Sequence, residues 1–97
     1  MKRQEVASFY KDLSSYAGKT VTVCGWARSI RDSKTLGFID LNDGTSFKGV
    51  QIVFEDGKID NFKEIASQNV GAALRVTGTL LATPEAKQPF EIHASEI

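Results

Sequence analysis

The sequence predicts an all-β domain, a small barrel of five strands with two short helical additions. Apolar and polar residues alternate over five separate stretches, which is the pattern of strands with one buried face. Turn-forming residues such as Asn42-Asp43-Gly44 separate these stretches. Helix-like spacing occurs twice, once before the first strand and once between the third and fourth strands. A chain of 97 residues has room for one domain with one core.

The first expected element is an amphipathic helix over residues 2–16. Val6, Phe9, Tyr10 and Leu13 stand at i, i+3, i+4 and i+7, which puts them on one side of such a helix. A run of small and polar residues that finishes in Gly18 ends it. We expect the helix to cover an edge or one end of the barrel; the alternative is a docking helix for a partner.

Three strands are expected next, over residues 19–29, 37–41 and 49–54. The first is long enough to bend, and Gly25 is the expected position of a bend or bulge. One parity of the three strands is apolar and is expected to face the core: Val21, Val23, Ala27, Ile39, Leu41, Val50, Ile52 and Phe54. The opposite parity carries Trp26, Arg28, Phe38 and Gln51, which would then lie on the outer surface.

A short helix at residues 60–68, with Asp60 as the candidate N-cap, precedes strands at 72–82 and 90–97. Gly78 suggests a second bend, and the last strand turns Glu91 and His93 outward. Three strands, one helix and two strands is the order of the OB-fold, a five-stranded barrel that binds oligonucleotides or oligosaccharides. The rival, an SH3-like barrel, would leave the second helix without a place.

Charge and composition exclude several classes of function. The chain has 12 basic and 12 acidic residues, so its net charge exerts no general attraction on nucleic acid or membrane. The first hairpin is nevertheless locally basic, which suits a small footprint on nucleic acid better than long-duplex binding. A single cysteine and a single histidine predict neither a disulfide nor a zinc site. Without a signal or membrane segment, a cytoplasmic protein is expected.

The sequence contains no recognisable catalytic motif. It lacks a phosphate-binding glycine loop, a dinucleotide fingerprint, a zinc-protease motif and a nucleophile elbow. The carboxylates are dispersed rather than paired for acid–base work, and His93 is expected to be a solvated strand residue. We therefore expect binding rather than catalysis, with no catalytic residue, metal or cofactor in this domain.

Phe38 is the most informative candidate for binding. An outward aromatic on such a sheet would stack on an unpaired base; the alternative is that Phe38 points inward at a local break in the alternation. Gln51 and Glu91 share the outward parity and together would offer a donor and an acceptor to a base edge.

Basic residues cluster in the first hairpin. Arg28, Arg31 and Lys34 would contact phosphates or stack on bases, although the same charges would also protect a hairpin edge from aggregation. Trp26 would either contact a ligand or pack against its neighbours.

Three short motifs together resemble a known family. They are Val23-x-Gly25-Trp26-x-x-x-x-Arg31-Asp32, then Gly37-Phe38-Ile39-x-Leu41-x-Asp43-Gly44, then Val50-Gln51. The chain from about residue 19 to 97 resembles the N-terminal anticodon-binding domain of class IIb aminoacyl-tRNA synthetases, which charge tRNA with aspartate, asparagine or lysine. Residues 27–54 and 82–97 are most similar to the bacterial asparaginyl-tRNA synthetase family.

The resemblance implies roles for individual residues. Phe38 would stack on an anticodon base, Gln51 and Glu91 would read the central uridine, and Arg31 would contact the anticodon loop. The loop before the last strand would read the third anticodon base, with candidates Glu85, Lys87 and Gln88.

The resemblance also implies that residues 1–97 are one domain of a longer synthetase. The family's catalytic signatures, Phe-Arg-x-Glu and Gly-x-Gly-x-x-Arg, are absent from these residues. ATP, magnesium and asparagine would bind a catalytic domain elsewhere in a homodimeric parent enzyme. The expected partner is the anticodon loop of tRNA(Asn). The alternatives are a free-standing, sequence-tolerant single-strand-binding protein and a protein-interaction barrel.

Overall fold

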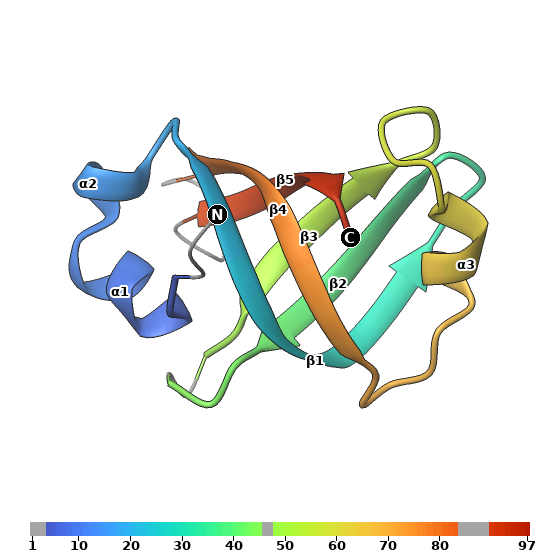
Figure 1. The fold of residues 1–97 in the computed structure, drawn as a ribbon, viewed down its shortest axis with the longest axis horizontal. Helices are drawn as coiled ribbons and strands as arrows, with labels where there is room; N and C mark the ends of the chain where they lie inside the picture. Colours follow the sequence, from blue (N-terminus) through green and yellow to red (C-terminus); the bar gives the residue numbers. More distant parts are fainter. Residues whose placement is uncertain (1–3, 46–47, 84–89) are drawn as a thin grey trace.

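The computed structural model describes residues 4–45, 48–83 and 90–97 of the chain. Its five strands close into a barrel in the order β1-β2-β3-β5-β4, with β4 returning to β1 (Figure 1). β3 and β5 run parallel, and the other neighbouring strands run antiparallel. The elements are α1 (Val6–Lys11), α2 (Leu13–Tyr16), β1 (Thr20–Asp32), β2 (Leu36–Asn42), β3 (Val50–Glu55), α3 (Phe62–Ala66), β4 (Ala73–Ala82) and β5 (Phe90–Glu96). This order confirms the expected OB-fold.

β1 is the strand that closes the barrel, because it has a different partner along each half of its 13 residues. Residues 20–26 pair with β4 and residues 26–32 pair with β2. The register with β2 shifts between Ala27 and Ser29, which leaves Arg28 as the extra residue of a β-bulge. The bulge therefore lies at Arg28 and not at Gly25, the expected position of a bend or bulge. A glycine is required at position 25 for a different reason, because a Cβ there would collide with the backbone oxygen of Asn42.

The bulge reverses which parity of β1 faces the core. Side chains alternate along a strand, so one extra residue moves each later side chain to the opposite face. Before the bulge, Ala27 is buried. After it, Ile30 packs against the core opposite Ile39, while Arg31 lies opposite Phe38 on the outer side.

The core is formed by the strand residues of the apolar parity, as the sequence predicts. Strand residues with less than a tenth of their surface exposed include Val21, Val23, Ala27, Ile39, Leu41, Val50, Ile52, Phe54, Val76, Leu80, Phe90, Ile92 and Ala94. Leu74, expected inward, is only partly buried. Gly78, the expected position of a bend, coincides with a register shift between β4 and β5, and a Cβ there would collide with the backbone of His93.

Two short helices, rather than one, precede the barrel. The chain leaves the helical conformation at Asp12 (φ −148°), whose carboxylate accepts hydrogen bonds from Ser14 Oγ at 3.2 Å and Ser15 Oγ at 2.6 Å. Local bonding of this kind competes with a continuous helix. Residues 2 and 3 of the expected helix lie outside the described residues. The apolar stripe does cover one end of the barrel, because Val6 and Phe9 are fully buried (Figure 1).

Tyr10 fastens α1 to the sheet. Its hydroxyl donates a hydrogen bond to the backbone oxygen of Gly49 at 2.7 Å, and its ring lies edge-on to Phe90 with centroids 4.7 Å apart. Burial raises the pKa of the Tyr10 phenol, and the negative charge of Asp40 raises it further.

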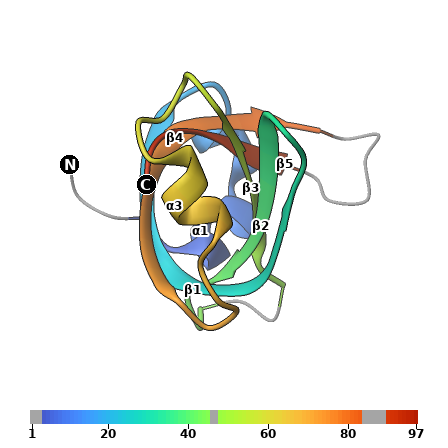
Figure 2. The same cartoon turned by 90° about the vertical axis from the view of Figure 1, so that its right-hand side faces the viewer.

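α3 covers the opposite end of the barrel, as Figure 2 shows. It is shorter than the expected 60–68 and follows Asn61 rather than Asp60 as its N-cap. The Asn61 side chain donates to the backbone oxygen of Ile97 at 3.3 Å and thus ties the helix to the end of the last strand. Phe62 is buried against Phe54, with ring centroids 5.2 Å apart.

Gly37→Ala is expected to lower the free energy of unfolding by ~1–3 kcal/mol, because the added Cβ would collide with the Phe54 ring in the core. Denaturant titration measures this loss. The cost should fall in a Phe54→Leu background, where the smaller side chain leaves room, whereas Ser29→Ala on the exposed side of β1 should be nearly neutral. Equal costs in both backgrounds would contradict the steric origin.

The raised pKa of the Tyr10 phenol predicts that the protein loses stability at alkaline pH. Its folded-state pKa lies above the ordinary value of 10.0, so the unfolded chain loses this proton first and the stabilisation disappears as pH rises through the folded value. The free energy of unfolding, measured by denaturant titration along a pH series, should fall above pH 10. The fall should be shallower in Tyr10→Phe and also in Asp40→Asn, which removes the neighbouring charge. An identical slope in all three proteins would contradict this role.

Candidate nucleic-acid interface

The strand registers arrange the outward side chains into two rows that cross the sheet from β1 to β4. The first row contains, in order across the strands, Ser29, Asp40, Gln51, Glu91 and Leu81. The second row contains Arg31, Phe38, Val53, His93 and Thr79. Neighbours in one row lie directly opposite one another on adjacent strands, close enough for their side chains to touch. The two rows define the outer face.

Phe38 points outward, so the alternative of an inward Phe38 is wrong. It is half-buried between the buried residues Gly37 and Ile39. The Arg31 guanidinium carbon lies 5.7 Å from the centre of the Phe38 ring, within range of a cation–π interaction. The two side chains together offer a flat aromatic surface with a positive charge attached to it.

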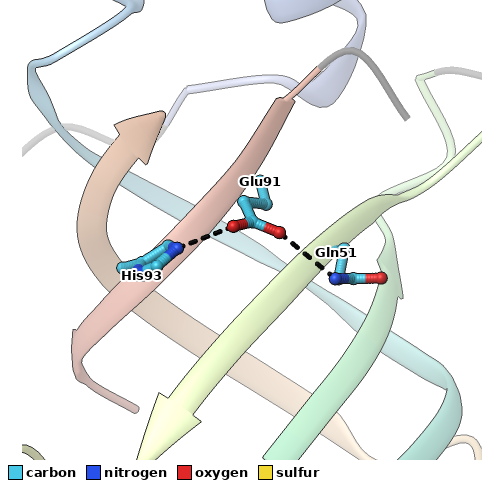
Figure 3. Close-up of polar contacts among 3 residues, drawn as sticks. All are labelled: Gln51, Glu91 and His93. Atoms are coloured by element: carbon cyan, nitrogen blue, oxygen red, sulfur yellow. Dashed lines mark hydrogen bonds and ion pairs between the residues drawn. The ribbon is translucent and has the colours of Figure 1, made fainter. Parts of the chain in front are cut away.

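Gln51, Glu91 and His93 form a hydrogen-bonded chain on the same face (Figure 3). Gln51 Nε2 donates to Glu91 Oε2 at 3.3 Å, across the parallel pairing of β3 and β5. Glu91 Oε1 lies 2.8 Å from His93 Nε2, two residues further along β5. His93 is therefore more than a solvated strand residue. The parallel pairing brings together two polar groups 40 residues apart in sequence.

Asp40 completes a polar patch beside Gln51. It lies opposite Gln51 on β2, and its Oδ1 atom is buried with no hydrogen-bond partner among the described residues. A Cβ at Gly49 would collide with this atom, so the backbone before β3 passes close by. Sequence reasoning did not select Asp40, or Leu81 at the end of the same row. Their outward parity was visible, but the strand order that makes them neighbours of Gln51 and Glu91 was not.

Three other candidates lie outside the two rows. Arg28 is exposed in the bulge of β1. Trp26 is 43% exposed and lies opposite Asn42, next to Gly44. Lys34 is exposed in the turn after β1.

The candidates Glu85, Lys87 and Gln88 fall outside the described residues. Within the described ranges no group of histidine, cysteine, aspartate and glutamate side chains is arranged to hold a metal ion. No helix in this part of the chain is long and apolar enough to cross a membrane.

A hollow of about 240 Å³ extends the outer face beyond His93. Its lining includes Val53 and Thr79 from the second row, together with Glu55 at the end of β3 and Lys58 in the turn that follows. The face thus offers an aromatic platform, a polar chain and an adjoining hollow, a combination suited to splayed, unpaired bases rather than to a duplex groove.

A family model described as an OB-fold nucleic acid binding domain matches residues 21–97. The chain belongs to this family. The match covers β1 from its second residue, the other four strands and α3, so both rows of the outer face lie within it.

Curated relatives are asparagine–tRNA ligases. The chain is 56% identical over all 97 residues to the enzyme of Bacillus cereus and 53% identical to that of Acetivibrio thermocellus. In both cases the match covers 100% of this chain and 21% of the relative, so the chain spans about a fifth of their length. The similarity to bacterial asparaginyl-tRNA synthetases is confirmed.

Solved structures share the fold. A Pyrococcus horikoshii asparaginyl-tRNA synthetase aligns with a TM-score of 0.74 at 22% identity, over 84% of this chain and 19% of that one. An OBody bound to hen egg-white lysozyme aligns with a TM-score of 0.80 at 23% identity, over 99% and 92%. The asparaginyl-tRNA synthetase of Entamoeba histolytica aligns with a TM-score of 0.69 at 30% identity, over 88% and 21%.

Proposed function

We propose that this domain binds the anticodon loop of tRNA(Asn) with the outer face of its barrel. The observation that carries the proposal is the Gln51–Glu91 hydrogen bond, next to Phe38 and Arg31, in a chain 56% identical to part of an asparagine–tRNA ligase. Rigid strands supply all four of these side chains, so little ordering is needed when RNA binds.

Phe38 stacks on one anticodon base. An aromatic platform of this kind contributes roughly 1–3 kcal/mol per base and accepts any base, because every base has a flat face. The Arg31 guanidinium, already against the Phe38 ring, adds attraction for the neighbouring phosphates. Stacking at Phe38 therefore supplies affinity but little sequence preference.

Gln51 and Glu91 supply the sequence preference. The pairing edge of uracil has one N–H donor between two carbonyl acceptors, whereas that of cytosine has an acceptor beside an amino donor. A carboxylate that accepts next to an amide that donates matches uracil and opposes cytosine. The pair reads the central uridine of the anticodon.

Electrostatics limits the footprint to the loop. The chain has no net charge, so attraction comes from local charges such as Arg31 and, in the nearby bulge, Arg28. A protein that contacts few phosphates shows a shallow dependence of affinity on salt. We expect a much shallower slope than that of proteins that bind long duplexes.

The proposal extends to a parent enzyme. Residues 1–97 act as the non-catalytic anticodon-binding domain of a longer asparagine–tRNA ligase, which is cytoplasmic and homodimeric. ATP, magnesium and asparagine bind its catalytic domain, outside these residues. Anchoring the anticodon here positions the tRNA so that its 3′ end reaches that distant site.

The test is a titration of the 97-residue chain with anticodon stem-loops at stated salt. A loop with the central uridine should bind at least about tenfold more tightly than the same loop with cytidine, a difference of roughly 1.4 kcal/mol. Equal affinity for both loops and for any unstructured strand would support a sequence-tolerant single-strand-binding protein instead. No binding even at low salt would favour a protein-interaction barrel.

Phe38→Ala is expected to weaken stem-loop binding roughly five- to a hundredfold, the equivalent of one lost base stack. The loss should be similar for the uridine and cytidine loops, because stacking does not read the base edge. Trp26→Ala is the matched control, an aromatic truncation outside the two rows, and should change affinity less than about twofold. Equal losses in both variants would contradict the assignment of Phe38.

A further inference from the structure

The outer face contains a residue that the proposed function leaves without a role. His93 is next to Glu91 on the same side of β5 and lies opposite Val53 and Thr79 on the neighbouring strands. It makes the shorter of the two hydrogen bonds to Glu91, 2.8 Å against 3.3 Å for Gln51. The Glu91 side chain is 25% exposed and that of His93 is 42% exposed, so both can be reached by a bound base (Figure 3).

The Glu91 carboxylate dictates the orientation of both neighbours. An ionised carboxylate accepts hydrogen bonds and cannot donate them, so the nitrogens that face it must carry protons. His93 therefore presents Nε2–H to Glu91 Oε1, and Gln51 turns its amide nitrogen, not its oxygen, toward Glu91 Oε2. The remaining lone pairs of the Glu91 carboxylate can accept a hydrogen bond from a ligand.

A partly exposed glutamate has several ways to turn into solvent. The bond from Gln51 Nε2 is 3.3 Å long, just beyond the usual range for an N–H donor, so it is a weak restraint on Glu91. The bond from His93 is shorter and comes from a two-torsion ring on the same strand. A charge-assisted bond of this length is the stronger of the two restraints.

We propose that His93 is a positioning residue for uridine selection: its Nε2–H holds the Glu91 carboxylate so that Glu91 accepts the uracil N3–H. This inference rests on the proposed function. Loss of His93 frees Glu91 to turn away, and the site then loses the acceptor that favours the N3–H of uracil over the unprotonated N3 of cytosine. His93 therefore acts on the preference for uridine and does not affect both loops equally.

The test compares both stem-loops, with central uridine or cytidine, across variants of the 97-residue chain. His93→Leu should lower the uridine-to-cytidine affinity ratio roughly three- to tenfold, the equivalent of one hydrogen bond of average net strength. His93→Gln, which carries an N–H at about the reach of Nε2, should restore most of the ratio. His93→Asn, one methylene shorter, should not. Ser95→Ala is the matched control, because it removes a donor on β5 that bonds to Thr77 instead of Glu91.

A comparison of single and double variants of His93 and Glu91 distinguishes a positioning role of His93 from direct contact between His93 and the RNA. In a Glu91→Gln background, His93→Leu should leave the already reduced ratio unchanged, because there is no carboxylate to position. Equal weakening of both loops by His93→Leu would overturn the inference, since His93 would then contact the RNA itself. An unchanged ratio in His93→Leu would also overturn it.

The same titrations distinguish failure of the proposed function from failure of the inference about His93. If the unaltered chain binds both loops equally, both the proposed function and the inference about His93 are wrong. If the unaltered chain prefers uridine and His93→Leu keeps the full preference, the inference alone fails. Thermal melting of each variant checks folding; should His93→Leu not fold, the comparison of His93→Gln with His93→Asn provides the same test.

Discussion

The bulge at Arg28 is the constraint on which the outer face depends. β1 must pair with β4 along its first half and with β2 along its second half, and a single flat strand cannot follow both neighbours. The extra residue bends β1 and shifts its later side chains by one position. Arg31 consequently lies over Phe38 instead of in the core. Closure of the barrel and formation of the aromatic platform have the same cause.

The parallel pairing of β3 and β5 is the second determinant. It places Gln51 directly opposite Glu91, and the alternation of β5 adds His93 to the same side. These side chains stand on strands whose other face is fully buried at Ile52 and Ile92. Burial of that face fixes the register, because a slip by one residue would expose the core and bury the polar groups. The geometry of the site is therefore maintained by the stability of the core beneath it.

Several parts of the site could be predicted from the sequence, and others could not. Alternation alone gives the outward direction of Phe38, Gln51 and Glu91, because each belongs to a short, regular strand. Arg31 is different: simple alternation from Val21 would turn it inward, and it was indicated only by the basic cluster of the first hairpin and by the resemblance to a family. The break at Asp12 and the bulge at Arg28 depend on local competition between hydrogen bonds and on strand closure, which residue spacing does not report.

The sequence by itself determined which residues are buried and which order of elements forms, since the burial of apolar side chains drives folding and leaves a periodic pattern along the chain. It also determined the family, through motifs spread along the chain. Only the tertiary structure decided which outward residues are neighbours. Asp40, Leu81 and His93 join Gln51 and Glu91 because β5 inserts between β3 and β4, and strand order arises from pairing among distant segments that alternation does not encode.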